Sequence, residues 1–176
     1  NMDNTNNKTG VFLMKIEFGC GETPTKTDFK TCDIRDLDGV DYVCAAWDID
    51  QHVEHNSIDE VFSRHFFEHL TFAQGEAVLD TWWNILKPGG KCEMMLPNMK
   101  FHINQWISGS DMDHARAGFW GWQRGDFADT WDVHKSGYDF LSLSELLISK
   151  GFTNINSLKK PTNKHLHITC EKPANI

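Results

Sequence analysis

The amino-acid sequence predicts an α/β protein with a largely parallel sheet. Apolar stretches typical of buried strands alternate with helical patterns, and the first stretch ends in a glycine turn, Gly19-Cys20-Gly21. In the segment LKPGGKCEMMLPN, proline and two glycines stop a helix and lead into another strand. Together these observations favour strands joined by short turns and a few helices.

Seven segments have the apolar character or the alternation of strands. They cover residues 11–18, 29–34, 41–47, 57–65, 91–97, 152–158 and 165–171. About ten residues separate the first two strands and about six separate the second from the third, whereas a parallel crossover usually needs a dozen or more. We therefore expect short crossovers that leave one sheet face thinly covered, to be closed by an aromatic stretch or by a partner subunit in a homodimer.

Two helices are predicted. Residues 75–87 carry apolar side chains at helical spacing, and the Pro-Gly-Gly at 88–90 ends this helix. The second helix is expected over about 142–150, with Ser142 or Ser144 as the N-cap and Gly151 as the stop.

The bulk properties indicate one soluble domain. The chain has 176 residues, of which 11–176 form the expected domain and 1–10 read as a disordered tail or an expression remnant. The formal net charge of −8 gives no electrostatic footprint for nucleic acid or for an anionic membrane. No apolar run approaches a membrane span, and the polar N-terminus has no secretion signal.

Cysteine usage favours a reducing compartment. The five cysteines include no Cys-x-x-Cys pair, and three of them lie in or beside apolar runs. We interpret them as buried, reduced thiols of a cytoplasmic protein.

Two features suggest a nucleotide-containing ligand. A strand that ends in Gly-x-Gly lets the backbone approach a ligand closely, although for this pattern alone a simple tight turn is the favoured interpretation. Asp33, at the end of the next strand, is placed to accept hydrogen bonds from ribose hydroxyls. The two features together favour a binding site.

The order of the segments EFGCGE, DIRD, NSIDEVFSRHFFEHL, LKPGGKCEMMLPN and HKSGYDFLSLSELLISKGF resembles that of the class I S-adenosylmethionine-dependent methyltransferases, over roughly residues 13–172. Within this family the chain is similar to the short predicted methyltransferases often encoded among glycan and cell-surface biosynthesis genes. The resemblance implies a Rossmann-like three-layer fold, with a seven-stranded, mostly parallel sheet of order 3-2-1-4-5-7-6 and an antiparallel last strand. Here the helices of the first half are abbreviated.

The resemblance also implies the cofactor, S-adenosylmethionine, which leaves as S-adenosylhomocysteine. The turn Gly19-Cys20-Gly21 would face its methionine part, with Glu17 near the amino group, and Asp33 would hold the ribose. Arg64 and His65 would pass close to the methionine end. Adenine would rest near Trp47 and Asp48.

The chain departs from the family pattern in three places. Glu22-Thr23-Pro24 stands where the third glycine is expected, the first helix is apparently absent, and Ala45 replaces an acidic residue near adenine. These departures leave open a second hypothesis, a catalytically degenerate S-adenosylmethionine-binding module.

A third hypothesis comes from residues 65–69. His65-Phe66-Phe67-Glu68-His69 matches H-x-x-E-H, in which two histidines four apart on a helix hold zinc and the glutamate activates water in a peptidase. The motif begins where a strand ends instead of within a helix, so the methyltransferase interpretation is preferred and assigns no metal ligand. His165 and His167 are interpreted as surface or interface residues.

The aromatic-rich stretch 98–138 is the candidate substrate lid, because acceptors bind beyond the carboxyl ends of the strands. Histidine titrates near neutral pH, so His134 is the preferred base, with His65 as a second candidate. The candidate substrate-binding residues would stack on a ring or bond to hydroxyl groups of a small-molecule acceptor. They are Trp120, Trp122, Gln123, Arg124, Asp126 and Trp131.

Overall fold

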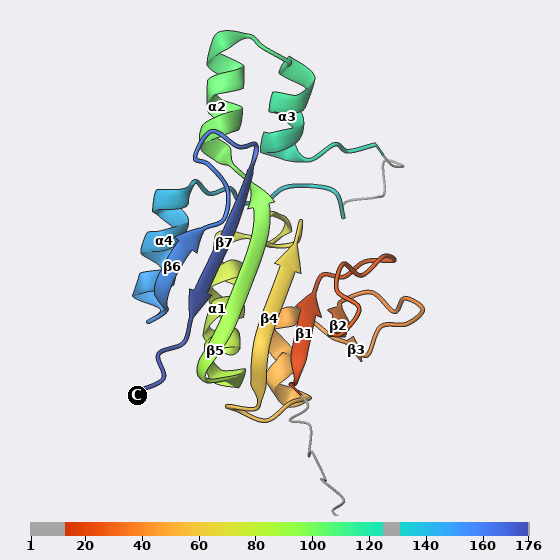
Figure 1. Ribbon diagram of the computed structural model, residues 1–176. Coiled ribbons are helices and arrows are strands. Elements are labelled where there is room, and N and C mark those ends of the chain that lie inside the picture. Colours follow the sequence, from red (N-terminus) through yellow and green to blue (C-terminus); the bar gives the residue numbers. More distant parts are fainter. Residues whose placement is uncertain (1–12, 125–130, 176) are drawn as a thin grey trace, which may run out of the picture.

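A computed structural model describes residues 13–124 and 131–175 (Figure 1). The predicted tail at 1–10, and Asp126 within the predicted lid, lie outside these residues. The elements, in chain order, are β1 (Lys15–Phe18), β2 (Lys30–Asp33), β3 (Tyr42–Val43), η1 (Ala46–Gln51), β4 (Ile58–Arg64), η2 (Phe67–His69), α1 (Phe72–Ile85), β5 (Leu86–Pro97), α2 (Met99–Ser108), α3 (Met112–Trp120), α4 (Phe140–Ser149), β6 (Thr153–Ser157) and β7 (His165–Glu171).

The seven strands form one sheet in the order β3-β2-β1-β4-β5-β7-β6. The pairs from β3 to β5 are parallel, and β7 runs antiparallel to both β5 and β6. This confirms the expected α/β class and the expected strand order.

The first two crossovers contain no helix in the described residues, which confirms the expected abbreviation of the first half. The segment 19–29 between β1 and β2 is instead held by the buried Glu17 carboxylate. This carboxylate accepts hydrogen bonds from the backbone N–H groups of Thr25, at 2.9 Å, and Lys26, at 2.8 Å. Phe29, at the end of the segment, packs edge-on against Phe62 of β4.

Element boundaries differ from the predictions where capping decides them. Helix α1 begins at Phe72 instead of residue 75, because the Thr71 side chain forms a capping box with Gln74. Helix α4 is capped by Asp139, so the prediction of Ser142 or Ser144 as the N-cap was wrong. The predicted third strand, 41–47, is only two residues long, because its second half turns into η1.

The core lies between the sheet and the helices behind it in Figure 1, where α1 crosses the strands. The Trp82 side chain of α1 is fully buried, and its ring centroid lies 5.0 Å from that of Phe18 on β1 and 6.4 Å from that of Phe67. Burial of such a large apolar surface contributes about 2–3 kcal/mol per side chain. It fixes the position of α1 against the strands that carry the site.

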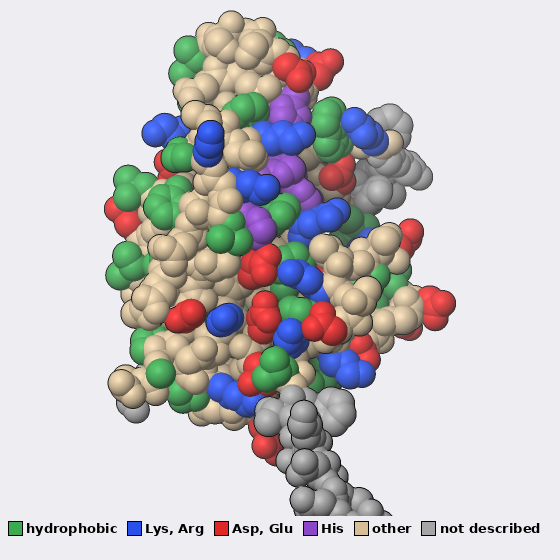
Figure 2. Space-filling view, viewed as in Figure 1, with side chains coloured by type: hydrophobic (Ala, Val, Ile, Leu, Met, Phe, Trp, Pro, Cys, Tyr) green, Lys and Arg blue, Asp and Glu red, His purple; other side chains and the backbone are tan. Residues whose placement is uncertain are grey.

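The opposite sheet face carries charged side chains, visible in red and blue in Figure 2. Glu93 of β5 lies 2.7 Å from His167 of β7 and 3.5 Å from Lys26, and Lys15 lies 3.6 Å from Glu60. Polar side chains thus occupy much of the face that short crossovers leave without a helix. The sheet face that was expected to be thinly covered thus carries charged pairs instead of an apolar surface there.

Helices α2 and α3 form a hairpin beyond the carboxyl ends of β4 and β5 (Figure 1). The hairpin belongs to the predicted lid, 98–138. None of the described helices is long and apolar enough to cross a membrane. All five cysteines are free, and only Cys44 is not buried, in agreement with the expected reduced thiols.

Candidate functional site

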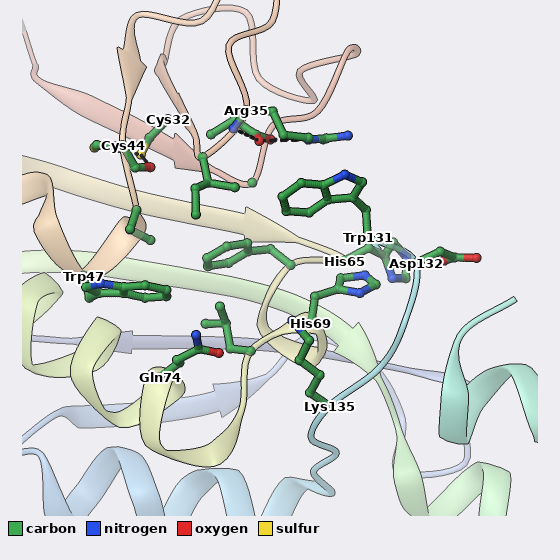
Figure 3. Close-up of a pocket in the computed structure, with 17 residues that line it drawn as sticks. Cys32, Arg35, Cys44, Trp47, His65, His69, Gln74, Trp131, Asp132 and Lys135 are labelled. Atoms are coloured by element: carbon green, nitrogen blue, oxygen red, sulfur yellow. Dashed lines mark hydrogen bonds and ion pairs between the residues drawn. The ribbon is translucent and has the colours of Figure 1, made fainter. Parts of the chain in front are cut away.

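A cavity of about 390 Å³ opens at the carboxyl ends of the parallel strands, within the ~300–1,000 Å³ range of small-molecule pockets. Four of its lining residues each follow a parallel strand directly: Gly19 after β1, Ile34 after β2, Cys44 after β3 and His65 after β4. The chain reverses its strand order between β1 and β4, and open α/β sheets bind ligands at this place. We call this space the strand-end cavity (Figure 3).

The glycine turn forms one wall of the strand-end cavity. Gly19 and Gly21 have positive φ angles of +64° and +60°, and the Gly19 N–H donates to the Cys32 carbonyl at 2.8 Å. A Cβ on Gly19 would lie 2.4 Å from the Phe66 ring. The missing side chain therefore makes room for Phe66, whereas Cys20 and Gly21 do not line the cavity.

Asp33 lines the cavity, but other groups already bond to its carboxylate. Its Oδ1 accepts from the Arg35 N–H at 3.0 Å and from Arg35 Nε at 3.1 Å, and its Oδ2 accepts from the Gly21 N–H at 2.9 Å. Burial opposes the charge, but the hydrogen bonds from Arg35 and Gly21 outweigh burial and lower the pKa of Asp33. Asp33 is therefore an ionised acceptor beside the glycine turn.

The turn after β3 forms the end of the cavity that Figure 3 shows around Trp47. Ala45, Ala46 and Trp47 line it together with Cys44. Asp48 does not line the cavity, and its carboxylate faces Gln51 at 3.4 Å.

His65 stands at the other end of the cavity in a left-handed conformation, with φ +50°. Its Nδ1 lies 3.1 Å from Oε1 of Glu68, whose side chain is buried. Arg64 is exposed and does not line the cavity, and neither does Glu17, whose carboxylate holds the segment 19–29.

A second cavity of about 360 Å³ adjoins the first and shares His65, His69 and Asp132 with it. Six of the nine histidines of the chain line this space, which we call the histidine cavity, and purple side chains gather in this region in Figure 2. They are His65, His69, His102, His114, His134 and His165.

Burial lowers the pKa of both His134 and His165, the latter to about 4. The neighbouring His69 contributes to the shift of His134, and His65 contributes to that of His165. His165 is thus a cavity residue, and its interpretation as a surface or interface residue was wrong. His134 lines only the histidine cavity, with Nδ1 3.0 Å from the Gly118 carbonyl oxygen.

The predicted substrate residues separate into three groups. Trp131 lines the strand-end cavity with Arg35 5.6 Å above its ring, and Trp122 lines the histidine cavity. Trp120 lies outside both cavities and packs against Trp106. Two others lie on the surface: Gln123 donates to the Trp120 carbonyl at 2.7 Å, and Arg124 stacks 3.9 Å above the ring of Trp122.

The H-x-x-E-H residues do not have the arrangement of the peptidase hypothesis. His65 follows a strand directly, and Glu68 and His69 lie in the short η2 turn, so the two histidines do not share the face of one α-helix. Oε1 of Glu68 lies 3.1 Å from Nδ1 of His65, so His65 contacts the glutamate that the motif assigns to water.

Sequence reasoning missed several lining residues of the strand-end cavity. Arg35 and Phe66 lie inside segments that carried the family resemblance, and each stands beside a predicted residue in the sequence: Arg35 two positions after Asp33, and Phe66 directly after His65. Gln74, Asp132 and Lys135 were not predicted either. They come from two distant stretches that only the fold brings together.

Comparisons with known proteins agree with this geometry. Residues 17–94 match the family model of a methyltransferase domain. No curated protein matches the chain.

Solved structures share the fold at low identity. The CurJ carbon methyltransferase has 16% identity and a TM-score of 0.61; the match covers 92% of this chain and 48% of the CurJ chain. A possible histamine N-methyltransferase from Thermotoga maritima has 14% identity and a TM-score of 0.63; the match covers 90% of this chain and 81% of that chain. A Burkholderia thailandensis N1-methyltransferase, solved with 1,6-didemethyltoxoflavin and S-adenosylhomocysteine, has 12% identity and a TM-score of 0.59, with 91% and 71% covered.

Proposed function

Because the chain has the class I S-adenosylmethionine-dependent methyltransferase fold and matches the methyltransferase domain over residues 17–94, we propose that it methylates a small-molecule or sugar-containing acceptor. The observation that carries this proposal is the strand-end cavity, in which residues following four parallel strands meet. S-adenosylmethionine is the cofactor of this family, and it supplies a methyl group already activated by a sulfonium.

The lining residues suit the parts of this cofactor. Trp47 and the backbone at Ala45 offer an apolar surface for adenine, Asp33 an ionised acceptor for ribose hydroxyls, and Gly19 a backbone free of a side chain. Arg35 has to move away from Asp33 for both ribose hydroxyls to bind. Its side chain is 34% exposed, so solvent can take over its hydrogen bonds.

The acceptor is proposed to lie in the histidine cavity, with Trp131 at its boundary with the cofactor. His65 replaces His134 as the proposed base, because His65 lines both cavities whereas His134 lines only the histidine cavity. The neutral ring donates from Nδ1 to the Glu68 carboxylate, which leaves Nε2 free to accept the proton of an acceptor hydroxyl. The acceptor oxygen then bonds to the methyl carbon as the carbon–sulfur bond breaks, and the electron pair stays on sulfur.

Calorimetry with S-adenosylmethionine and S-adenosylhomocysteine tests the cofactor part. We expect one molecule bound per chain. Release of S-adenosylhomocysteine in the presence of sugar-containing and aromatic hydroxyl acceptors tests the transfer. His65→Gln should lower kcat with little effect on cofactor affinity, whereas the exposed His55→Gln should change neither. Absence of cofactor binding would overturn the proposal.

A binding module without turnover is the second candidate, favoured by the departures from the family pattern at Glu22-Thr23-Pro24 and Ala45. It predicts cofactor binding with no acceptor-dependent release of product.

The net charge of −8 supports a non-nucleic-acid acceptor, and the five free thiols support a cytoplasmic location.

A further inference from the structure

Two side chains from the η2 turn and one from a distant segment converge where the two cavities meet. Glu68, His69 and His134 each offer one ligand atom, and these atoms all lie within 4.8 Å of one another. We propose that Glu68, His69 and His134 bind a divalent transition-metal ion of the zinc type, next to the methyl-transfer site. This set shares Glu68 and His69 with the H-x-x-E-H motif but replaces His65 with His134, 65 positions beyond His69.

In the imidazole rings of His69 and His134, a hydrogen bond at Nδ1 leaves Nε2 free to bind a metal ion. His69 Nδ1 lies 3.1 Å from the Val133 carbonyl oxygen, and His134 Nδ1 lies 3.0 Å from the Gly118 carbonyl oxygen. A carbonyl can only accept, so in each neutral ring Nδ1 carries the hydrogen and Nε2 carries the lone pair. Metal-binding histidines commonly have this arrangement, with a backbone carbonyl fixing the tautomer.

The carboxylate of Glu68 supplies the independent observation. Its side chain is 1% exposed, and Oε2 has no hydrogen-bond partner within residues 13–124 and 131–175. A buried carboxylate oxygen without a partner is costly, and a cation beside it removes that cost. The other oxygen, Oε1, is held by His65 at 3.1 Å, which orients the carboxylate.

The backbone fixes the three side chains relative to each other. The carbonyl of Glu68 accepts from the N–H of Lys135 at 2.8 Å, and the N–H of His134 donates to the Trp120 carbonyl at 3.3 Å. The rings of His69 and His134 lie 5.0 Å apart, edge to face. Ligand atoms of a tetrahedral zinc ion are ~3.3 Å apart, so a modest side-chain movement closes the site.

The chemistry of the three ligands determines which metal ion the site would prefer and what the ion would do there. Two imidazoles and one carboxylate suit zinc or iron(II) better than calcium or magnesium, which prefer oxygen ligands. Three protein ligands leave at least one position open. If the proposed methyl transfer holds, an acceptor hydroxyl bound there would lose its proton more readily and would lie beside the strand-end cavity.

The test is a zinc titration of the full chain, without a polyhistidine tag and freed of metal with a chelator, followed by calorimetry. We expect one ion per chain. Glu68→Gln should weaken zinc affinity at least tenfold, and His69→Gln and His134→Gln still more. The control, His55→Gln, removes an exposed imidazole outside both cavities and should bind zinc as the unchanged chain does.

Nitrogen NMR of the unchanged chain keeps the test valid if a variant does not fold. Zinc should shift the Nε2 resonances of only two histidines. No stoichiometric zinc binding, equal affinity in His69→Gln or His134→Gln, or shifts in other histidines would overturn the site. Cofactor calorimetry on the zinc-free chain separates this outcome from failure of the proposed function, because Glu68 and His134 do not line the strand-end cavity and no cofactor contact is proposed for His69.

Discussion

The Asp33 carboxylate and the Arg35 guanidinium lie 3.1 Å apart at the edge of the strand-end cavity. The acidic residue predicted to hold a ribose is thus bonded to a neighbour two positions along the chain. Asp33 is 5% exposed, whereas the Arg35 side chain is 34% exposed. The carboxylate is therefore the fixed part of the pair and the guanidinium is the part that can leave.

This asymmetry predicts opposite effects at the two positions. Asp33→Ala should weaken S-adenosylmethionine binding by about 1–3 kcal/mol, because two ribose hydroxyls lose their acceptor. Arg35→Ala should leave the affinity unchanged or improve it, because a partly exposed ion pair contributes at most about 1 kcal/mol. Calorimetry measures both, with Asp36→Ala as an exposed control. A strong loss in Arg35→Ala would instead make Arg35 a cofactor ligand.

Gly19 and Gly39 offer a matched pair for testing the glycine turn. Both have positive φ angles, +64° and +81°, but a Cβ on Gly39 would meet no atom within 4 Å, whereas one on Gly19 would clash with Phe66. Gly39→Ala should therefore cost only the backbone strain of about 1–2 kcal/mol. Gly19→Ala should cost roughly 2–5 kcal/mol, because overpacking adds to the strain. Urea unfolding measures the free energy of unfolding of both variants. Equal losses in the two variants would rule out the Phe66 contact as the reason for glycine at position 19.

Glu17 is predicted to stabilise the segment 19–29 and not to contact the cofactor. Glu17→Gln should reduce the free energy of unfolding by about 1–3 kcal/mol, because a neutral amide oxygen accepts more weakly than a carboxylate and the amide nitrogen would face the Thr25 N–H group. Hydrogen exchange of these two amides should accelerate. Glu22→Gln, at an exposed position in the same segment, is the control. A loss of cofactor affinity without a loss of stability would restore the role near the methionine amino group.

Acid should destabilise the fold in two separate steps. The pKa of His165 is about 4, below its ordinary 6.5, because burial and the nearby His65, Lys164 and His102 oppose protonation more than Glu68 favours it. The folded chain therefore binds this proton less readily than the unfolded chain. The stabilisation is complete above about pH 6.5 and is lost as the pH falls towards 4, on the order of 2 kcal/mol.

Urea unfolding in the presence of a chelator at pH 7, 5.5 and 4 measures this loss of free energy of unfolding. His165→Gln should make the free energy of unfolding less dependent on pH, whereas His55→Gln should not. The pKa of Asp33 is also lowered, but from 3.8, so its contribution is lost only at still lower pH. An unchanged slope in His165→Gln would mean that His165 is not the titrating group.

The sequence predicted the strands because their signals are local. Apolar runs marked β1, β4, β5 and β7, and the glycine turn and Asp33 were placed correctly at two strand ends. The predicted helix starts were wrong, although Thr71 with Gln74 and Asp139 with Ser142 are local capping boxes, because the predictions followed the apolar spacing and the serines instead.

By itself, the sequence determined the α/β class, the turn at Gly19 and the ionisable residue at Asp33, because each depends on residues close together in the chain. Only the tertiary structure decided that Arg35 bonds to Asp33, that Glu17 holds a segment in place of a helix, and that His134 meets Glu68 and His69. Six histidines spread from position 65 to 165 share one cavity because the sheet order brings distant strand ends together. The spacing of residues along the sequence does not predict such long-range contacts.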